Sequence, residues 1–252
     1  MTSERNFKDH FSTVSASYAA HRPTYPASLI DFLTSIVPER ELAWDAGCGS
    51  GQLSVLLAAR FERVIATDAS AEQLGQATPR ANIEYRVARA ETSGMADATV
   101  DLAVAAQAAH WFELERYYAE VRRVARPGAI VALVSYDMCS IDERLDPLVD
   151  HFYGGVLGRH WPAERKHVED AYRSFPFPFR EIEAPPLAIE VDWTLAQFLG
   201  YVDTWSAVRA LLRSDGRAAL EAFQRELSSA WGAARLTHSI RWPLGMRVGH
   251  AR

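Results

Sequence analysis

The chain has 252 residues, of which 48% are hydrophobic and 23% charged, with a formal net charge of -5 and a pI near 5.9. This length fits one α/β domain with an inserted segment, and it is large enough to bury its own core. Nucleic-acid surfaces need clustered Lys and Arg, so the acidic balance argues against a nucleic-acid partner. The local basic run of Arg122, Arg123 and Arg126 is better explained as a solvated helix end.

Two cysteines, Cys48 and Cys139, lie far apart and have no CxxC spacing. They suggest neither a disulfide framework nor a zinc site, and the histidines show no metal-ligand spacing, so we expect no metal. The sequence begins without the apolar core of a signal peptide, and no apolar run reaches about 18 residues. We therefore expect a cytoplasmic protein without a membrane partner, either a monomer or a homodimer.

The first half of the chain alternates apolar strands with helices. This rhythm is typical of βαβ units and of a parallel sheet covered on both faces, which predicts a doubly wound α/β fold. In chain order we predict a helix over residues 27–37, a strand over 42–46, a helix over 53–58, a strand over 64–68, a helix begun by the capping pair Ser70 and Gln73, strands over 83–87 and 100–105, a helix over 114–125, and a strand over 129–135.

The pattern changes after Tyr136. Residues 137–185 show no strand rhythm and are rich in aromatic residues and prolines, which we interpret as a small helical, aromatic cap inserted over the ligand edge of the sheet. Later elements are a strand over 187–191, helices over 194–213 and 216–231, and a strand over 239–248. The expected divisions of the single domain are an N-terminal lid and first helix (1–40), a cofactor-binding core (41–136), the cap (137–185), and strands and helices that complete the sheet (186–252).

A glycine-rich turn follows the first predicted strand, with Asp45, Gly47, Gly49 and Gly51 at alternate positions. Glycines let the chain turn tightly and let a ligand approach the backbone, next to the bare N–H groups of a helix start. The spacing fits the dinucleotide fingerprint G-x-G-x-x-G poorly. The third glycine, Gly51, lies two positions after Gly49, whereas the fingerprint requires three. An acidic residue before the turn would repel a pyrophosphate and attract a cationic amino group.

Polar residues also follow the next three strands. Asp68 ends the second strand and can accept hydrogen bonds from ribose hydroxyls, Glu91 follows the third, and residues 107–112 (QAAHWF) follow the fourth. Each has a simpler explanation: Asp68 as a helix cap, Glu91 as a solvent-exposed charge, and His110 with Trp111 as a packing pair. Four such segments at successive strand ends nevertheless indicate one ligand site at the carboxyl edge of the sheet.

These segments resemble class I S-adenosylmethionine (SAM)-dependent methyltransferases of type 11, over residues 10–136. The resemblance implies a Rossmann-like, mostly parallel seven-stranded sheet, with SAM as cofactor and S-adenosylhomocysteine as product. A finer similarity is to the trans-aconitate methyltransferase-like branch. It is carried by residues 18–26, 44–52 (WDAGCGSGQ), 66–70 and 106–112, and more weakly by 204–206 and 242–244.

The resemblance also implies roles for single residues around SAM. The methionine part would lie against Gly47, Gly49 and Gly51, with its amino group at Asp45, its sulfonium near Gln107, and its carboxylate under a lid formed by Tyr18 and Arg22. The nucleoside would be held by Asp68 at the ribose and by Ala69, Ala90 and Glu91 at the adenine, and Cys48 and Gln73 complete the predicted cofactor set.

The expected reaction is in-line transfer of a methyl group to a small molecule, for which orientation is the main contribution of the protein. A carboxylate acceptor is already ionised and needs no general base. The candidate residues on the acceptor side are His110, for positioning or as a base, and Trp111, Tyr136, Trp205 and Arg209. Two alternatives are a non-catalytic SAM-binding or interaction protein on the same fold, and a nicotinamide oxidoreductase, which the glycine spacing disfavours.

Overall fold

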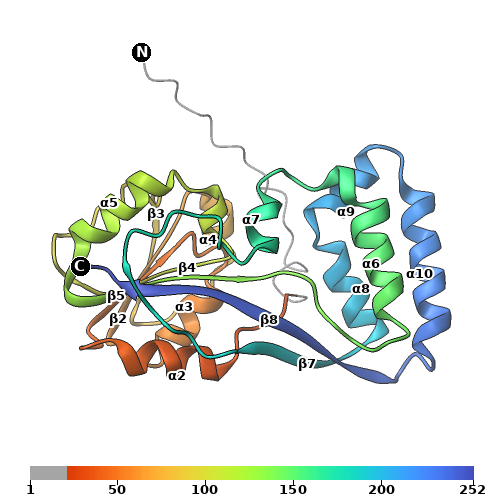
Figure 1. Cartoon of the computed structure of the whole chain (residues 1–252), viewed down its shortest axis with the longest axis horizontal. Helices are drawn as coiled ribbons and strands as arrows, with labels where there is room; N and C mark the ends of the chain where they lie inside the picture. Colours follow the sequence, from red (N-terminus) through yellow and green to blue (C-terminus); the bar gives the residue numbers. More distant parts are fainter. Residues whose placement is uncertain (1–21) are drawn as a thin grey trace, which may run out of the picture.

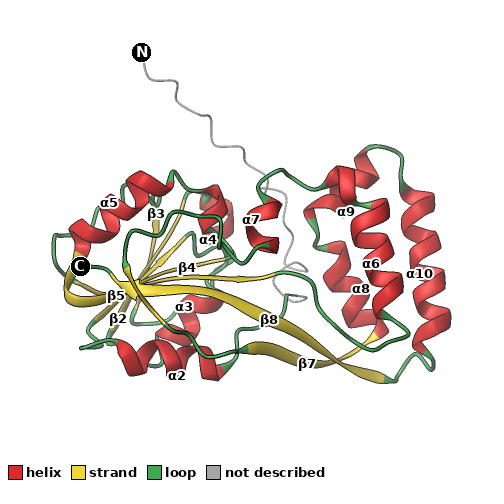
Figure 2. Ribbon diagram, viewed as in Figure 1, coloured by secondary structure: helices red, strands yellow, loops and turns green. Residues whose placement is uncertain are grey.

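A computed structural model describes residues 22–252. A twisted central sheet carries helices on both faces, and a second group of helices lies beyond one end of it (Figure 1, Figure 2). The strands are β1 (Leu42–Ala46), β2 (Arg63–Asp68), β3 (Ile83–Val87), β4 (Val100–Ala106), β5 (Ala125–Tyr136), β6 (Arg180–Ile182), β7 (Ala188–Thr194) and β8 (Thr237–His250). The helices are α2 (Ala27–Ile36), α3 (Gln52–Leu57), α4 (Ala71–Leu74), α5 (Leu114–Val124), α6 (Asp146–Asp150), α7 (Arg165–Glu169), α8 (Leu195–Asp203), α9 (Ser206–Arg213) and α10 (Arg217–Trp231), with short helical turns η1 (Ala109–Trp111), η2 (His151–Val156) and η3 (Gly158–His160).

The strand order is β3-β2-β1-β4-β5-β8-β6, and β7 pairs with β8 outside this path. The strands from β3 to β5 run parallel, whereas β8 is antiparallel to β5, β6 and β7. The predicted Rossmann-like, mostly parallel α/β fold is therefore confirmed. The order reverses between β1 and β4, and in such sheets the crevice at this switch point is where ligands bind.

The two faces of the sheet are covered by different helices. Along β4, Leu102 and Val104 pack in one hydrophobic cluster with α2 and α3, whereas Ala103 packs in the other with α5. This alternation is the side-chain period of a strand. Burial on both sides explains why these strands are apolar throughout and were readily predicted from the sequence.

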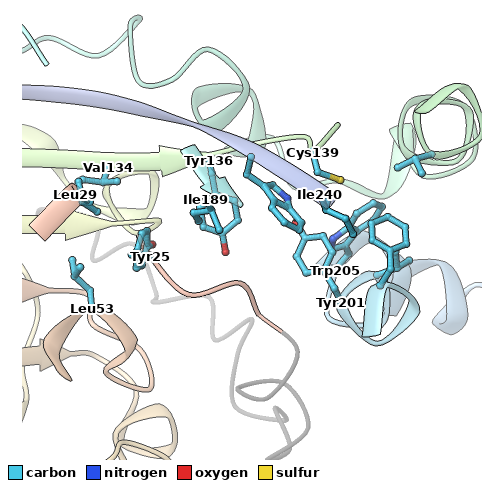
Figure 3. Close-up of a cluster of buried hydrophobic side chains, with 14 of the residues drawn as sticks. Tyr25, Leu29, Leu53, Val134, Tyr136, Cys139, Ile189, Tyr201, Trp205 and Ile240 are labelled. Atoms are coloured by element: carbon cyan, nitrogen blue, oxygen red, sulfur yellow. The ribbon is translucent and has the colours of Figure 1, made fainter. Parts of the chain in front are cut away.

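The long strand β8 connects the sheet to the second group of helices. Its C-terminal part pairs with β5 and β6, and its N-terminal part extends beyond them to pair with β7. The distal helices, α6, α8, α9 and α10, stand over this extension (Figure 1). One apolar cluster runs from the sheet into them through Tyr136, Tyr201, Trp205 and Trp242 (Figure 3 labels the first three).

Two details differ from the sequence prediction. The single helix expected over 194–213 is two helices, broken at Thr204 and Trp205, because Trp205 is extended (φ -67°, ψ 132°) and the Thr204 hydroxyl donates to the Tyr201 carbonyl. Strand β6 lies inside the segment 137–185, where no strand was expected. It has only three residues and no apolar alternation.

Within residues 22–252, no helix is long and apolar enough to cross a membrane.

Asp101 joins the starts of two central strands. Its Oδ2 accepts hydrogen bonds from the backbone N–H groups of Glu41 and Leu42, both at 2.9 Å, and its Oδ1 lies 3.1 Å from Arg126 Nη1. The Asp101 side chain is fully buried. It therefore satisfies the buried Leu42 N–H and the partly buried Glu41 N–H.

Replacing Asp101 with Ala should lower the free energy of unfolding by about 2–4 kcal/mol, because it leaves one buried and one partly buried amide without their acceptor. Urea denaturation measures this loss. Asp97→Ala is the control, since Asp97 is an exposed carboxylate whose pairing with Arg123 contributes little. Equal stability losses in the two variants would contradict this role of Asp101.

Candidate functional site

Two adjoining cavities open at the carboxyl edge of the sheet. The edge cavity, about 1050 Å³, is lined by the ends of β1, β2 and β4 and the segments that follow them. The distal cavity, about 510 Å³, lies between the end of β5, residues 153–165 and the helices α8 and α9. The two cavities share the lining residues Arg22, Gln107, His110, Trp111 and Tyr136.

The glycine turn forms the floor of the edge cavity. Gly47 has φ +69°, and a Cβ there would come within 2.6 Å of the Ala108 Cβ. Gly49 has φ +56°, and its Cβ would meet only Gln73 Oε1, at 3.8 Å, so this position is open toward the cavity. A ligand can therefore approach the backbone closely at Gly49.

Gly51, the third glycine of the turn, has a structural role at the start of α3. It does not line the cavity, and a Cβ on it would come within 2.5 Å of the Tyr85 hydroxyl. It lies at the N-cap of α3 with φ +77°, a conformation that favours glycine. Gly51 thus turns the chain into the helix and lets β3 pack closely, and its predicted contact with the methionine part of SAM stays a prediction.

Asp68 holds this turn in place. One carboxylate oxygen accepts from the Gly49 N–H and the other from the Ser70 N–H, both at 2.8 Å. Burial raises the pKa of Asp68, and hydrogen bonds from the backbone amides of Ser70, Gly49 and Ala69 oppose that rise. Each carboxylate oxygen has a further lone pair that can accept a ligand hydroxyl. Ser70 also caps α4 by accepting from the Gln73 N–H, which is one half of the predicted capping box, while the Ser70 N–H donates to Asp68.

Asp45 is a buried carboxyl at the end of β1. Its Oδ2 accepts a hydrogen bond of 2.6 Å from the Ser54 hydroxyl. Burial raises the pKa of Asp45 to about 7, against the opposing effect of that hydrogen bond and with a smaller rise caused by Asp68. A cationic group placed beside Asp45 would stabilise the carboxylate and reverse this shift.

Gln107 and Glu91 are held by the backbone of neighbouring segments. Gln107 has φ +54°, and its side-chain amide donates to the Tyr136 carbonyl at 2.6 Å, which joins the ends of β4 and β5. Glu91 accepts from the Glu113 N–H at 2.8 Å and lies 3.6 Å from Arg89. Its side chain is only 7% exposed, which is inconsistent with a simple solvent-exposed charge.

The structure brings most of the predicted residues together. The predicted acceptor-side residues His110, Trp111, Tyr136, Trp205 and Arg209 all line the distal cavity. Tyr18 lies outside the described residues. The predicted cofactor residues that line the edge cavity are Arg22, Asp45, Gly47, Cys48, Gly49, Asp68, Ala69, Gln73, Ala90, Glu91 and Gln107.

Sequence reasoning missed Arg165, on α7 in the wall of the distal cavity. Its guanidinium pairs with Asp137 and donates to the Tyr153 hydroxyl at 2.8 Å. It also lies over the rings of Tyr153 and Trp161, at 5.5 and 5.0 Å from their centroids. No local pattern marks this arginine, because its partners come from distant parts of the chain. The aromatic and proline-rich composition of 137–185 was the available signal.

Within residues 22–252, no group of three or more His, Cys, Asp or Glu side chains is arranged to hold a metal ion. The polar groups that face the edge cavity are instead suited to an organic ligand. The carboxyls of Asp45, Asp68 and Glu91 line this cavity, and the absence of a side chain at Gly49 leaves the backbone there accessible to a ligand.

Comparison with known proteins places this architecture among methyltransferases. The sequence profile of a family described as a methyltransferase domain matches residues 44–133. A Dictyostelium discoideum protein named as a methyltransferase is 32% identical over 229 residues, covering 89% of this chain and 87% of that protein. An uncharacterized methyltransferase of Mycobacterium tuberculosis is 33% identical over 195 residues, covering 76% and 73%. A solved structure from Anaeromyxobacter dehalogenans, described as a type II methyltransferase, has 48% identity and a TM-score of 0.87, covering 91% of this chain and 98% of that one.

The raised pKa of Asp45 predicts a pH-dependent stability. Between the unfolded value of 3.8 and the folded value of about 7, the folded protein keeps a proton that the unfolded chain releases. The contribution of Asp45 to stability is therefore greatest below the unfolded pKa and is lost as the pH rises through the folded one. From about pH 5 to about pH 8, this group should cost the ligand-free protein about 2–3 kcal/mol.

Asp45→Asn removes the titrating group and keeps an acceptor for Ser54. Urea denaturation at both pH values should show the extra loss in the wild-type protein and not in the variant. Parallel losses would show that Asp45 is ionised in the folded protein throughout this range.

Proposed function

The chain belongs to the methyltransferase family, and on that premise we propose that it transfers a methyl group from SAM to a small anionic molecule, with a carboxylate oxygen as the acceptor. The observation that carries the proposal is the pair of adjoining cavities that share five lining residues. A donor in one and an acceptor in the other would meet at this shared wall, as an in-line displacement requires. The finer assignment to the trans-aconitate methyltransferase-like branch stays a prediction.

The edge cavity fits SAM better than a dinucleotide. Asp68 offers carboxylate oxygens to ribose hydroxyls, and Gly49 leaves room for the methionine chain. The buried Asp45 carboxyl suits the cationic amino group, and Arg22 suits the carboxylate of the same moiety. Acidic groups around the glycine turn disfavour a pyrophosphate, which argues against the nicotinamide alternative. When bound, SAM supplies an electrophilic methyl group.

The distal cavity supplies the acceptor side. Arg165, Arg209 and Arg213 line it, against the single carboxylate of Asp137. Trp161 and Trp205 form apolar walls for the body of the acceptor. Arginine forks bind carboxylates in a fixed geometry, so this wall favours a small organic acid.

The chain's own groups then act by positioning. A carboxylate oxygen is already nucleophilic at neutral pH, so no proton has to be removed from it. Gln107, whose amide is held by the Tyr136 carbonyl, stands at the shared wall between the cavities. Orientation of two reactants can lower a barrier by about 7–11 kcal/mol.

Asp68→Asn should weaken SAM binding by about 10- to 100-fold. The amide replaces one acceptor with a donor, which faces the backbone N–H of either Gly49 or Ser70 and leaves fewer acceptors for the ribose. Isothermal titration calorimetry with SAM measures the effect. Asp97→Asn, on an exposed carboxylate away from the cavity, is the matched control. An Asp68→Asn affinity equal to that of the control would contradict the cofactor site.

The acceptor class can be tested with methyl-labelled SAM and matched panels of small acids, phenols and amines. We expect transfer to an acid, with a base-labile ester as product. Arg165→Met should lower kcat/KM for that acid by about tenfold or more, since a charged hydrogen bond is lost, whereas Arg116→Met at an exposed site should not. Labelled phenols or amines instead of acids would overturn the carboxylate assignment. SAM binding without transfer to any acceptor would favour the non-catalytic alternative.

A further inference from the structure

The backbone is strained beside the shared wall of the two cavities. Ala171 and Tyr172, after α7, have φ values of +56° and +60°. Side-chain-bearing residues rarely adopt this left-handed conformation, and two in succession persist only where the surroundings hold them. Such strain concentrates at functional sites, so the purpose of this turn can be sought in what it positions.

Strand β8 packs against the turn at Ala171 and Tyr172 and holds it in place. A Cβ at Gly245 would overlap the Ala171 side chain, so glycine at this position lets the turn lie against the strand. Two residues along, Arg247 Nη1 donates to the carbonyls of Tyr172 and Phe175, at 3.1 and 3.2 Å. Glu181 fixes that arginine through a 2.6 Å ion pair.

The turn buries the Tyr172 side chain completely. Its ring stacks on Phe175, with centroids 5.0 Å apart. Its hydroxyl lies 2.9 Å from Nδ1 of His110. The backbone amides of His110 and Ala109 also hydrogen-bond the phenol oxygen, but they can only donate. Within residues 22–252, His110 Nδ1 is therefore the one acceptor for the phenol O–H. His110 itself lines both cavities.

The proton positions follow from satisfying this buried pair. A phenol carries one O–H, and a neutral imidazole carries one N–H on either nitrogen. If Nδ1 held the proton and donated to Tyr172, the phenol O–H would be buried without an acceptor. If Tyr172 donates to Nδ1, the buried phenol O–H has its acceptor, and the proton of the neutral imidazole must be on Nε2.

We propose that Tyr172 is a positioning residue that holds His110 as the Nε2–H tautomer, so that His110 meets the acceptor as a hydrogen-bond donor and not as a base. The tautomer assignment stands on the buried pair alone, and the role toward the acceptor rests on the proposed function. An Nε2–H donor at the shared wall would hold one oxygen of a carboxylate while the other takes the methyl group.

The electrostatics of the pair agree with this assignment. Burial lowers the pKa of His110 to about 3, with further lowering by Arg165 and His167. Burial likewise raises the pKa of Tyr172 above its usual range, although Arg165 and the backbone amides of His110 and Ala109 act in the opposite direction. Both groups are therefore neutral at physiological pH, and an imidazole of such low basicity is a poor general base.

The tautomer can be measured without any assumption about activity. Protein labelled with ¹⁵N-histidine should show the His110 ring, assigned by its loss in His110→Gln, with a protonated Nε2 and an unprotonated Nδ1 from about pH 5 to about pH 8. Tyr172→Phe should shift the ring nitrogens toward a tautomer mixture. A protonated Nδ1 in the wild-type protein, or an unchanged spectrum in Tyr172→Phe, would overturn the proposal.

Kinetics then test the role in transfer. Tyr172→Phe should lower kcat by about tenfold, the effect of misplacing one hydrogen bond, without changing SAM affinity. Tyr118→Phe is the matched control, because Tyr118 is also a buried tyrosine but its hydroxyl has no hydrogen-bond partner within residues 22–252.

His110→Gln keeps an N–H donor and should retain more activity than His110→Ala. Equal losses in these two His110 variants, or a normal kcat in Tyr172→Phe, would overturn the donor role. Absence of any transfer by the wild-type protein would count against the proposed function and leave the NMR result standing.

Discussion

The site depends on the two hydrogen bonds that the Asp68 carboxylate accepts from the backbone N–H groups of Gly49 and Ser70. They tie the turn after β1 to the end of β2, so that the switch point of the sheet becomes a shaped crevice. Neither bond involves a side-chain donor, so the geometry is set by the backbone. The glycines make that backbone path possible, and Asp68 selects it.

Around this crevice, charge is distributed in two zones. Asp45, Asp68 and Glu91 make the edge cavity acidic, while Arg165 and its neighbours make the distal cavity basic. A ligand with a cationic amino group and a sulfonium suits the first zone, and an organic acid suits the second. The boundary between them is where the proposed methyl transfer would occur, and neutral side chains are held there by the backbone and by Tyr172.

The distal cavity depends on one long strand. Because β8 continues past β5, it supports both the sheet and the distal helices, and it also carries the glycine and arginine that hold the Tyr172 turn. Contacts of β8 with the turn at Tyr172 are thus linked to His110 through the hydrogen bond between Tyr172 and His110. This connection gives β8 a role in the site as well as in the sheet.

The sequence by itself determined the parallel sheet, the glycine turn and the strand-end residues of the edge cavity. Buried strands and tight turns leave local signals: apolar runs of strand length, glycines at alternate positions, and a carboxylate at a strand end. Tertiary structure alone decided that Gly51 packs against Tyr85, that the helix over 194–213 breaks at Trp205, and that Arg165 and Tyr172 join the site. These depend on contacts between segments far apart in the chain, where spacing along the sequence carries no information about distance in space.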